Sequence, residues 1–451
     1  MNVPTDPAAT FSAHLATLAQ RVAPILSACG YDSLVVHSGT QRMAFLDDQA
    51  YPLRSNPHFL WWVPLRDTPD CLLQFTPGHK PVLIFQSSDD FWHKPAQLPD
   101  AAWTRCFDIR PVSTAEAARG ALDPVSPLTA FVGEPFEGLT DFGFAVVNPQ
   151  PLLRRLHEQR VRKTPWEIDC LRAASLLGAR GHLAAEARFA AGGSEFAIHQ
   201  AFLEGCMLRE QELPYQAIVA LNDNCATLHY QQLERRAPSQ LHSLLIDAGA
   251  QRHGYASDIT RTYAAVGGDF ESLVQGMDAV QQSLCAAVRP GIDWRDLHLT
   301  AHHLLAELLI EQQLIHADPE DAVQRGLTSV FLPHGLGHLL GLQVHDVAGR
   351  LPDPDGPTLD PPAGHPYLRL TRVLEPGFVV TMEPGLYFID SLLEKAMTGA
   401  HGNLINWRRV QALRACGGIR IEDNLLVTDG GCENLTRDAF DRLATGRPSA
   451  G

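Results

Sequence analysis

The sequence predicts a chain of two domains, an N-terminal α/β domain followed by an α+β domain. The length of 451 residues accommodates two or three domains of ordinary size. Hydrophobic residues make up 45% of the chain and charged residues 19%, which is typical of globular proteins and unlike disordered or fibrous chains. The pattern of strands and helices also changes after a strong helix-start signal near residue 164, so the boundary between the domains is expected there.

Short apolar runs and helical spacing alternate in the first part of the chain. Residues 32–37 and 80–85 have the composition of buried strands, whereas residues 11–22 and 114–122 carry apolar side chains at helical spacing. Strands that alternate with helices in this way predict an α/β domain.

The boundary signal is the string Thr164-Pro-Trp-Glu167, which has a hydroxyl at the N-cap, proline at the first helical position and glutamate at the third. The helix that it begins is expected to end near Ala191, because Gly192-Gly193 follows. We therefore expect domains of residues 1–160 and 161–451.

The second domain is expected to mix strands with helices over residues 277–288 and 294–313. Residues 352–366 differ from both, because they contain six prolines in 15 residues and no periodicity. A structureless loop of this length inside a compact domain is usually functional or disordered. Since it lies between two strings rich in polar site residues, we interpret it as a lid or wall of a site.

Charge and cysteine content exclude several classes of function. With 36 Lys and Arg against 51 Asp and Glu, the net charge is −15, which disfavours nucleic-acid binding. Nine scattered cysteines without a Cys-x-x-Cys pair indicate free thiols in a reducing compartment. Residues 1–6 lack the pattern of a signal peptide, and no apolar stretch approaches a membrane span. We expect a cytoplasmic protein without a membrane partner.

Two carboxylates accompany a pair of apolar strands. Asp247 ends the run Leu244-Leu-Ile-Asp247, and Asp258 lies in a second strand that extends over residues 254–263. A hairpin would bring both acids onto one face of adjacent strands, where they would repel each other unless cations neutralised them. A turn acid plus a surface acid is the alternative interpretation of this pair.

Three histidines occur close together in an apolar, glycine-rich string. His334, His338 and His345 lie within Pro333-His-Gly-Leu-Gly-His-Leu-Leu-Gly-Leu-Gln-Val-His-Asp346. An isolated histidine is usually a packed core or surface residue, but packing alone does not favour three imidazoles in such a string. The string therefore indicates a site.

Further acids end or occupy two later strands. Glu383 follows the apolar run 378–382 and precedes a predicted Pro-Gly turn. In the strand 417–427, Arg420, Glu422 and Asn424 share one face by the alternation of strand side chains. That face is either a solvated surface with an Arg–Glu pair or part of the same site as the other acids.

The combined set has four carboxylates and at least one imidazole. Oxygen-rich ligation with one nitrogen suits hard or borderline divalent ions such as Mn²⁺. Two divalent cations would balance the four negative charges, and paired metals are a recurring arrangement for hydrolysis.

The strings that hold these residues resemble the pita-bread metallopeptidase family, which includes methionine aminopeptidase, aminopeptidase P and prolidase. Among the branches of this family, they are most similar to the bacterial prolidases (Xaa-Pro dipeptidases). The matching strings are Ala226-Thr-Leu-His-Tyr230, Tyr255-Ala-Ser-Asp-Ile-Thr-Arg-Thr262, His334-Gly-Leu-Gly-His338, Gly341-Leu-Gln-Val-His-Asp-Val-Ala-Gly349, Leu374-Glu-Pro-Gly377, Glu383-Pro-Gly385 and Gly417-Gly-Ile-Arg-Ile-Glu-Asp-Asn424. In the first domain the strings are Phe45-Leu-Asp-Asp-Gln-Ala-Tyr-Pro52, Asn56-Pro-His-Phe59 and Asp90-Phe-Trp-His93, so the resemblance covers nearly the whole chain. It implies a creatinase-N-like first domain and a second domain with a curved, mainly antiparallel sheet backed by helices.

The resemblance implies a site for two divalent metal ions per subunit, with Mn²⁺ preferred and Co²⁺, Zn²⁺ or Fe²⁺ as alternatives. Asp258 and Glu422 would bridge both ions, Asp247 would chelate one, and His338 and Glu383 would bind the other. A hydroxide between the metals would attack the scissile carbonyl.

Two histidines and one of the ligands receive further roles from the same resemblance. Glu383 would also shuttle the proton, His345 would stabilise the oxyanion of the tetrahedral intermediate, and His334 would contact the substrate.

The substrate pocket has several candidates. A dipeptide has a free carboxylate, which an arginine fork would recognise. Arg369 and Arg372 follow the proline-rich loop and Arg420 is a third candidate, and the sequence leaves the choice open. The resemblance also places His229 and Arg420 at substrate-pocket positions or behind the ligands, and Tyr230 lies beside a matched position.

The expected activity is hydrolysis of dipeptides with C-terminal proline, by a homodimer in which the partner's first domain, through the stretch Leu46-Asp-Asp48, closes the active site. The alternatives are an aminopeptidase P that acts on longer Xaa-Pro peptides and a side activity on organophosphorus triesters. A non-catalytic binding protein on the same scaffold, or a metal-independent creatine-type hydrolase, is disfavoured because all five ligand positions are intact.

Overall fold

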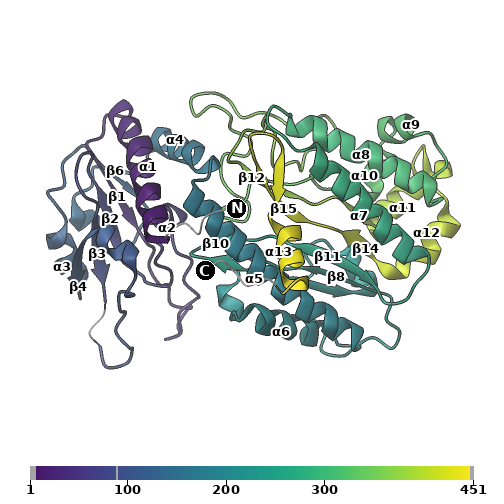
Figure 1. The fold of residues 1–451 in the computed structure, drawn as a ribbon, viewed down its shortest axis with the longest axis horizontal. Coiled ribbons are helices and arrows are strands. Elements are labelled where there is room, and N and C mark those ends of the chain that lie inside the picture. Colours follow the sequence, from purple (N-terminus) through teal and green to yellow (C-terminus); the bar gives the residue numbers. More distant parts are fainter. Residues whose placement is uncertain (1–6, 88–89, 447–451) are drawn as a thin grey trace. The chain divides into compact units, whose positions relative to one another are not determined.

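The computed structural model describes residues 7–87 and 90–446 (Figure 1). These residues form two compact units. The first contains the described residues up to Arg160 together with Thr164–Glu167, and the second contains Val161–Lys163 and the described residues from Ile168 onward. The expectation that the chain begins without a signal peptide concerns residues 1–6, which lie outside the described part.

The first unit is built on a six-stranded mixed sheet in the order β4-β3-β2-β1-β5-β6. Strand β1 pairs in parallel with β5 and antiparallel with β2, and β3 pairs in parallel with β4. The strands are β1 (Ser33–His37), β2 (Leu72–Phe75), β3 (Val82–Gln86), β4 (Asp108–Val112), β5 (Thr129–Val132) and β6 (Val146–Val147). The helices are α1 (Pro7–Ala28), α2 (Pro57–Trp62), α3 (Ala115–Ala121) and α4 (Gln150–Val161).

The predicted elements of this unit correspond closely to these. The two predicted strands are β1 and β3, and the two predicted helical stretches lie in α1 and α3. Val35, Ile84 and Phe131 are fully buried in one apolar cluster of the sheet. The prediction of an N-terminal α/β domain is therefore confirmed.

The predicted capping box begins the long helix α5 (Pro165–Ala190). The Thr164 N–H donates to Glu167 Oε2 at 2.8 Å, and the Glu167 N–H donates to Thr164 Oγ1 at 3.4 Å. The helix ends one residue before Ala191, and Gly192 takes a φ of 76°, the left-handed conformation that terminates helices and that glycine adopts without strain.

The second unit holds several small antiparallel sheets. One has the order β11-β8-β7, a second the order β12-β15-β16, and the pairs β10-β9 and β13-β14 complete the set. The strands are β7 (Ile218–Leu221), β8 (Ser243–Asp247), β9 (Gln251–Arg252), β10 (Tyr255–Ala256), β11 (Thr260–Ala264), β12 (Val379–Met382), β13 (Gly385–Tyr387), β14 (Gly418–Arg420), β15 (Asp423–Val427) and β16 (Cys432–Asn434).

Helices cover both faces of the strands of this unit, with α5 and α6 on one side and α7 and α8 on the other (Figure 1). Successive residues of β8 alternate between the two layers, because Leu245 belongs to the cluster with α7 and α8, whereas Leu244 and Ile246 belong to the cluster with α5 and α6. The helices are α6 (Glu195–Cys206), α7 (Asp269–Ala287), α8 (Trp294–Glu311), α9 (Pro319–Gln324), α10 (Leu327–Phe331), α11 (Asp390–Thr398), α12 (Trp407–Leu413) and α13 (Leu435–Ala444).

Two expectations about single strands need correction. The strand expected over residues 254–263 is divided into β10 and β11, with Asp258 in the segment between them. The Pro-Gly turn expected after Glu383 is not a turn, because Gly385 begins strand β13 and the chain continues in extended form. Asp258 thus lies in the gap between β10 and β11, and Glu383 lies in the gap between β12 and β13.

Residues 352–366, which we call the proline-rich loop, contain no helix or strand, as predicted. Within the described residues, no helix is both long and apolar enough to cross a bilayer.

Candidate metal centre

Two of the predicted ligands come from the sheet of β7, β8 and β11. Asp247 is the last residue of β8 and lies opposite Thr260 in the antiparallel register with β11. Asp258 precedes Thr260 by two residues, so strand alternation directs both toward the same face. Asp247 lies on β8, whereas Asp258 lies in the segment just before β11 and is only 5% exposed.

Two more carboxylates lie where a second pair of strands is interrupted. Glu383 separates β12 from β13, and Glu422 separates β14 from β15, while β12 pairs with β15 and β13 with β14. The Ile421 N–H donates to the Pro384 carbonyl across this double interruption. A bridge between Thr260 and Glu422 connects it to β11, so all four acids converge.

The fifth predicted ligand, His338, arrives on the loop that precedes β12. Its backbone N–H donates to Thr381 Oγ1 at 3.1 Å, and its Nδ1 donates to the Leu339 carbonyl at 3.0 Å. The loop approaches the strand closely because residue 337 is glycine, where a Cβ atom would lie 2.1 Å from the Thr381 carbonyl oxygen. The ring is thereby fixed with Nε2 directed at the acids.

The distances bring the five residues into one cluster. His338 Nε2 lies 3.4 Å from Asp258 Oδ2 and 3.6 Å from Glu383 Oε1. One ligand atom each of Asp258, His338 and Glu422 lies within 4.8 Å of the other two. Thr260 connects Asp247 to this group. It is the cross-strand partner of Asp247, and its hydroxyl donates to Glu422 Oε2 at 2.7 Å.

The electrostatics show that this cluster holds too much negative charge for the chain alone. Burial raises the pKa of Glu383 to about 7, and Asp258 and Asp247 act in the same direction. Burial, Asp258 and Glu383 together raise the pKa of Glu422 well above its usual value. Burial also opposes ionisation of Asp258, but the hydrogen bond and charge of His338 outweigh it and lower that pKa. Cations are the ordinary compensation for such a set.

A buried arginine holds the remaining part of the cluster in place. The Arg420 guanidinium donates to Asp247 Oδ2 at 2.7 Å, to the Tyr387 hydroxyl at 2.8 Å and to Thr260 Oγ1 at 3.2 Å. Tyr387 lies 2.8 Å from His334 Nε2, while His334 Nδ1 donates to the Gly335 carbonyl at 2.8 Å. Burial lowers the pKa of His334 to about 4, so the ring is neutral near pH 7.

Three predicted residues lie at the exposed side of the cluster. The His345 ring lies 4.4 Å from the His338 ring, edge to face, and burial together with His338 lowers the pKa of His345 to about 4. His229 and Arg369 are exposed, and the Arg369 charge also acts to lower the pKa of His345. Arg369 makes no hydrogen bond or ion pair to any residue within the described part of the chain, so its fork is free for a ligand.

The structure does not support two of the predicted substrate residues. Arg372 is 2% exposed, donates to the carbonyls of Ala348 and Leu351, and lies over the Phe378 ring, so its guanidinium is occupied in holding the backbone. Tyr230 is also buried, and its hydroxyl donates to Glu195 at 2.7 Å instead of facing the cluster.

Two residues of the cluster were missed by the sequence reasoning. The Tyr215 hydroxyl donates to Asp247 Oδ1 at 2.8 Å, and Thr260 contacts Arg420 and Glu422. No spacing rule singles out Tyr215, which lies on the segment before β7. Thr260 had a signal, because it follows Asp258 by two residues and must share its strand face.

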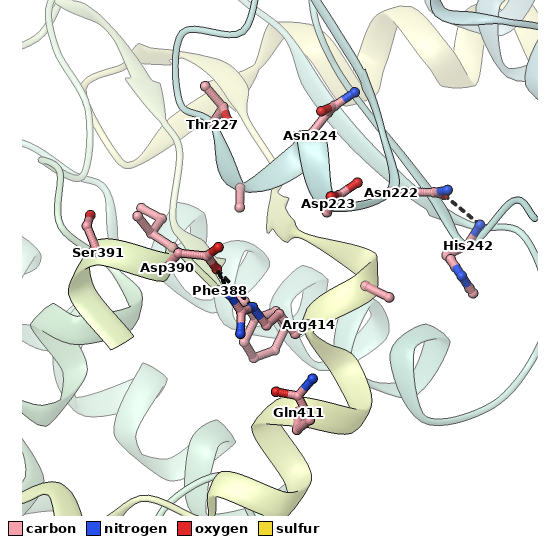
Figure 2. A pocket seen from close by; sticks show the side chains of 13 residues that line it. Asn222, Asp223, Asn224, Thr227, His242, Phe388, Asp390, Ser391, Gln411 and Arg414 are labelled. Carbon is pink, nitrogen blue, oxygen red and sulfur yellow. Dashed lines mark hydrogen bonds and ion pairs between the residues drawn. The ribbon is translucent and has the colours of Figure 1, made fainter. Parts of the chain in front are cut away.

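A separate polar pocket of about 790 Å³ contains none of the predicted site residues. Arg414 Nη2 forms an ion pair with Asp390 Oδ1 at 2.7 Å, and the His242 N–H donates to Asn222. Figure 2 shows both pairs among the residues that line the pocket. Its lining consists of Asn222, Asp223, Asn224, Ala226, Thr227, His242, Phe388, Ile389, Asp390, Ser391, Gln411, Arg414 and Ala415. Because its two acids, Asp223 and Asp390, form no ligand cluster with its histidine, the carboxylate cluster is the better candidate site.

Comparison with known families and proteins gives matches along most of the chain. Residues 9–157 match the family "Xaa-Pro dipeptidase, N-terminal domain", and residues 169–429 match "Metallopeptidase family M24". A Xaa-Pro dipeptidase of Stenotrophomonas maltophilia is 49% identical over 436 residues, 96% of this chain and 98% of that protein. A Xaa-Pro dipeptidase of Aeromonas hydrophila is 47% identical, covering 95% of this chain and 98% of that protein.

Among solved structures, the fold is similar to aminopeptidases P. Zinc-substituted Escherichia coli aminopeptidase P in complex with product superimposes with a TM-score of 0.69 at 21% identity, over 96% of this chain and 99% of that one. Proline aminopeptidase P II from Yersinia pestis gives a TM-score of 0.70 at 23% identity, over 96% and 99%. At these identities the likeness concerns the fold, and it agrees with the expected α+β second domain.

Proposed function

This chain belongs to metallopeptidase family M24, and from that premise we propose that it is a metal-dependent hydrolase that cleaves the Xaa-Pro bond of dipeptides. The observation that carries the proposal is the buried ligand group of Asp258, His338 and Glu422, beside which the partly buried Asp247 and Glu383 lie. The relatives that cover nearly the whole chain are named Xaa-Pro dipeptidases. The aminopeptidases P share the fold at much lower identity, so the dipeptidase reading is favoured over an enzyme for longer peptides.

The donor set fits two divalent cations. Four carboxylates and one imidazole suit Mn²⁺, with Co²⁺, Zn²⁺ or Fe²⁺ as alternatives. Asp258 and Glu422 would be shared by both ions, Asp247 would hold one, and His338 and Glu383 the other. Such ions supply an activated water and polarise the substrate carbonyl. Analysis of metal bound to the purified protein tests this, and a chain that retains no divalent ion would contradict it.

The chain's own groups would supply proton transfer and positioning. Glu383 is the candidate for carrying the proton, because its carboxylate lies beside His338, 3.6 Å from Nε2, at the part of the cluster where the water would be activated. His345, exposed beside His338, is placed to donate to the developing oxyanion. His334 is held neutral between Gly335 and Tyr387 and offers an edge to the substrate.

Arg369 is the candidate for the substrate carboxylate. Arg372 is bound to backbone carbonyls and Arg420 to Asp247, whereas the Arg369 side chain is exposed. Its neighbour Leu368 packs on Gly335, beside His334. A bidentate contact with a carboxylate contributes about 1.5–3 kcal/mol, which corresponds to roughly 10–100-fold in affinity.

We expect the Mn²⁺-loaded enzyme to cleave Ala-Pro and to leave Ala-Pro-Ala largely intact, because the carboxylate subsite ends the pocket after proline. Arg369→Ala should raise KM for Ala-Pro about 10–100-fold and leave kcat much less changed. The measurement is release of alanine from each peptide, with Arg252→Ala, an exposed arginine of β9, as the matched control. Cleavage of the tripeptide alone would show that the enzyme is an aminopeptidase P instead.

Residues 1–160 are proposed to serve dimerisation and closure of the partner's active site. Phe45 and Leu46 support this, because their side chains are 87% and 90% exposed on the first unit beside Asp47 and Asp48. Large apolar side chains in such a position are typical of surfaces that are covered by a partner. We expect light scattering to give twice the chain mass, and Leu46→Glu to give the single-chain mass. A monomeric and fully active wild-type protein would contradict the proposal.

A cytoplasmic location is proposed as well. All nine cysteines are free, and most are buried, as expected for a reducing compartment. Fractionation of the source cells tests this location.

A further inference from the structure

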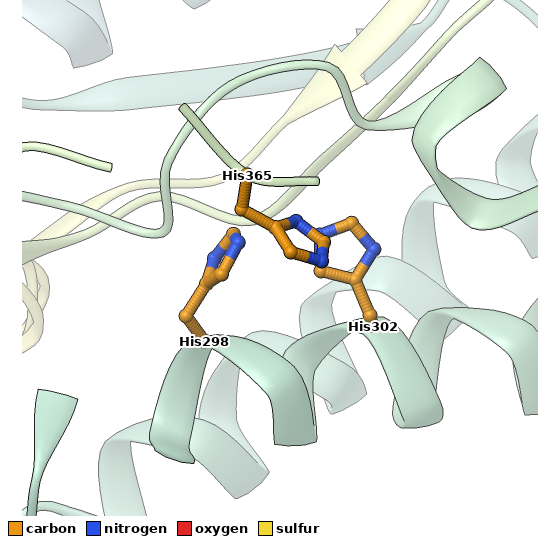
Figure 3. Close-up of side chains that lie close together, drawn as sticks. All are labelled: His298, His302 and His365. Atoms are coloured by element: carbon orange, nitrogen blue, oxygen red, sulfur yellow. The ribbon is translucent and has the colours of Figure 1, made fainter. Parts of the chain in front are cut away.

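A second group of ligand-type side chains lies outside the carboxylate cluster. His298 and His302 are one helical turn apart on α8, and His365 reaches them from the proline-rich loop (Figure 3). The ring centroids lie 4.8 Å apart for His298 and His302, 4.6 Å for His298 and His365, and 4.5 Å for His302 and His365. One ring nitrogen of each lies within 4.8 Å of the other two.

The chain does not satisfy the polar atoms of this group. His298 is fully buried, and neither of its ring nitrogens has a hydrogen-bond partner among the described residues. His302 is also fully buried, and its Nε2 has no such partner there, although its Nδ1 lies 2.9 Å from Thr328 Oγ1. A buried nitrogen left without a partner loses its hydration without a compensating hydrogen bond, which destabilises the fold. Two neighbouring buried rings with unpartnered nitrogens, and a third ring within ligand distance of both, indicate that something else binds there.

The three rings are in the form that binds metals. Burial lowers the pKa of His298 to about 2 and that of His302 to about 3, and it lowers the pKa of His365 as well. They are therefore neutral near pH 7, with a lone pair available on each ring. His302 Nδ1 lies 2.9 Å from Thr328 Oγ1, and in the tautomer in which Nδ1 donates to this hydroxyl the lone pair is on Nε2. An outer contact of this kind is the usual way in which a ligand histidine is oriented.

We propose that His298, His302 and His365 bind one transition-metal ion of the Zn²⁺ class, at a site separate from the dinuclear centre. A ligand set made only of imidazole suits Zn²⁺, Ni²⁺, Co²⁺ or Cu²⁺ and disfavours Mg²⁺, Ca²⁺ and Mn²⁺, which prefer oxygen. Three histidines leave a fourth tetrahedral position for water, on the half-buried side where His365 lies. Nitrogens around tetrahedral zinc lie about 3.4 Å apart, whereas the three ring nitrogens here lie within 4.8 Å of one another. On binding, His365 would move closer to His298 and His302, because it is carried by a loop.

The bound ion would join α8 to the proline-rich loop. That loop continues into Tyr367 and Leu368, which pack on Gly335, since a Cβ there would lie 2.9 Å from Leu368 Cα. Gly335 adjoins His334, and Leu368 adjoins Arg369. The metal would therefore fix the segment that carries Arg369, the candidate for binding the substrate carboxylate. The proline-rich loop would then form a wall of the substrate site, and its position would depend on this ion.

Zinc content tests the proposal. Untagged protein is stripped with chelator, saturated with Zn²⁺, and freed of unbound metal, and the zinc per chain is measured. We expect three ions in the wild type and two in His365→Ala, with at least a tenfold weaker third site in the variant. His303→Ala is the matched control, because that side chain is the next one on α8, is 40% exposed and does not belong to the group.

The position of the third ion gives an independent readout. Anomalous scattering at the zinc edge from wild-type crystals should place one ion between the three rings, and crystals of His365→Ala should lack it. His365 is chosen because it is half-buried on a loop, so its loss spares the core. Equal zinc content in wild type and His365→Ala, or wild-type crystals without an ion between the rings, would overturn the proposal. An ion between the three rings in crystals that hold no metal at the carboxylate cluster would support this proposal. The same result would contradict the proposed function.

Discussion

Glu383→Gln is expected to lower kcat for Ala-Pro by about 10³-fold, because it removes the carboxylate placed to move protons while keeping the shape of the side chain. Glu383 Oε1 lies 3.6 Å from His338 Nε2 and 3.5 Å from Thr381 Oγ1, so glutamine can occupy the same position. The measurement is kcat and KM for Ala-Pro with metal content determined on the same samples. KM should change less than kcat, since proton transfer matters mainly in the transition state.

This variant should fold at least as well as the wild type. Burial raises the pKa of Glu383 to about 7, so ionising it in the folded, metal-free chain is unfavourable, and a neutral amide removes that burden. Glu375→Gln is the matched control, because Glu375 pairs with Arg162 at a partly exposed position before β12. A Glu383→Gln enzyme with normal metal content and activity within tenfold of the wild type would show that another group moves the proton.

The candidate ligands could be predicted from the sequence because metal sites need carboxylates and histidines. Such side chains stand out where they occur in or directly after apolar runs. Asp247 ends an apolar run, and Glu422 alternates with isoleucines, so strand periodicity put Glu422 on the polar face of its strand. Periodicity left open whether that face is a solvated surface or part of the site, and the joint ligand set was implied by the resemblance to the pita-bread family. The surrounding hydrogen bonds were harder to foresee. Arg420 donates to Asp247, whereas Arg372 donates to backbone carbonyls. This difference depends on packing between segments that are far apart in the chain. Arginines of equal charge cannot be distinguished by sequence position.

The fold class was predictable for a similar reason. Capping residues act locally, and Thr164 with Glu167 formed the predicted box. Interruptions of strands are set by neighbouring strands, so the division of β10 from β11 and the continuation into β13 were not foreseen. The spacing of His298 and His302 on one helical face was visible as well. Its meaning was not, because His365 comes from a loop without any periodicity that could place it.

Arg420→Met is expected to lower the free energy of unfolding of the metal-free protein by about 3–5 kcal/mol, because it leaves the Asp247 carboxylate buried without its cation. Arg420 is 5% exposed and is shared by Asp247, Tyr387 and Thr260, so no solvent replaces it. Burial is already the largest influence that raises the pKa of Asp247, and Arg420 is the main one that opposes it. The measurement is urea unfolding of chelator-treated protein.

Arg414→Met is the matched control, because Arg414 pairs with exposed Asp390 and such a surface pair contributes about 0–1 kcal/mol. Divalent metal should restore most of the stability lost in Arg420→Met, since cations beside Asp247 take over the compensation of its charge. Arg420→Lys should fall between, because an ammonium keeps the charge but cannot span Asp247, Tyr387 and Thr260 with one planar fork. Equal losses in Arg420→Met and Arg414→Met would mean that Asp247 is neutral in the metal-free fold, so that Arg420 has no buried negative charge to balance there.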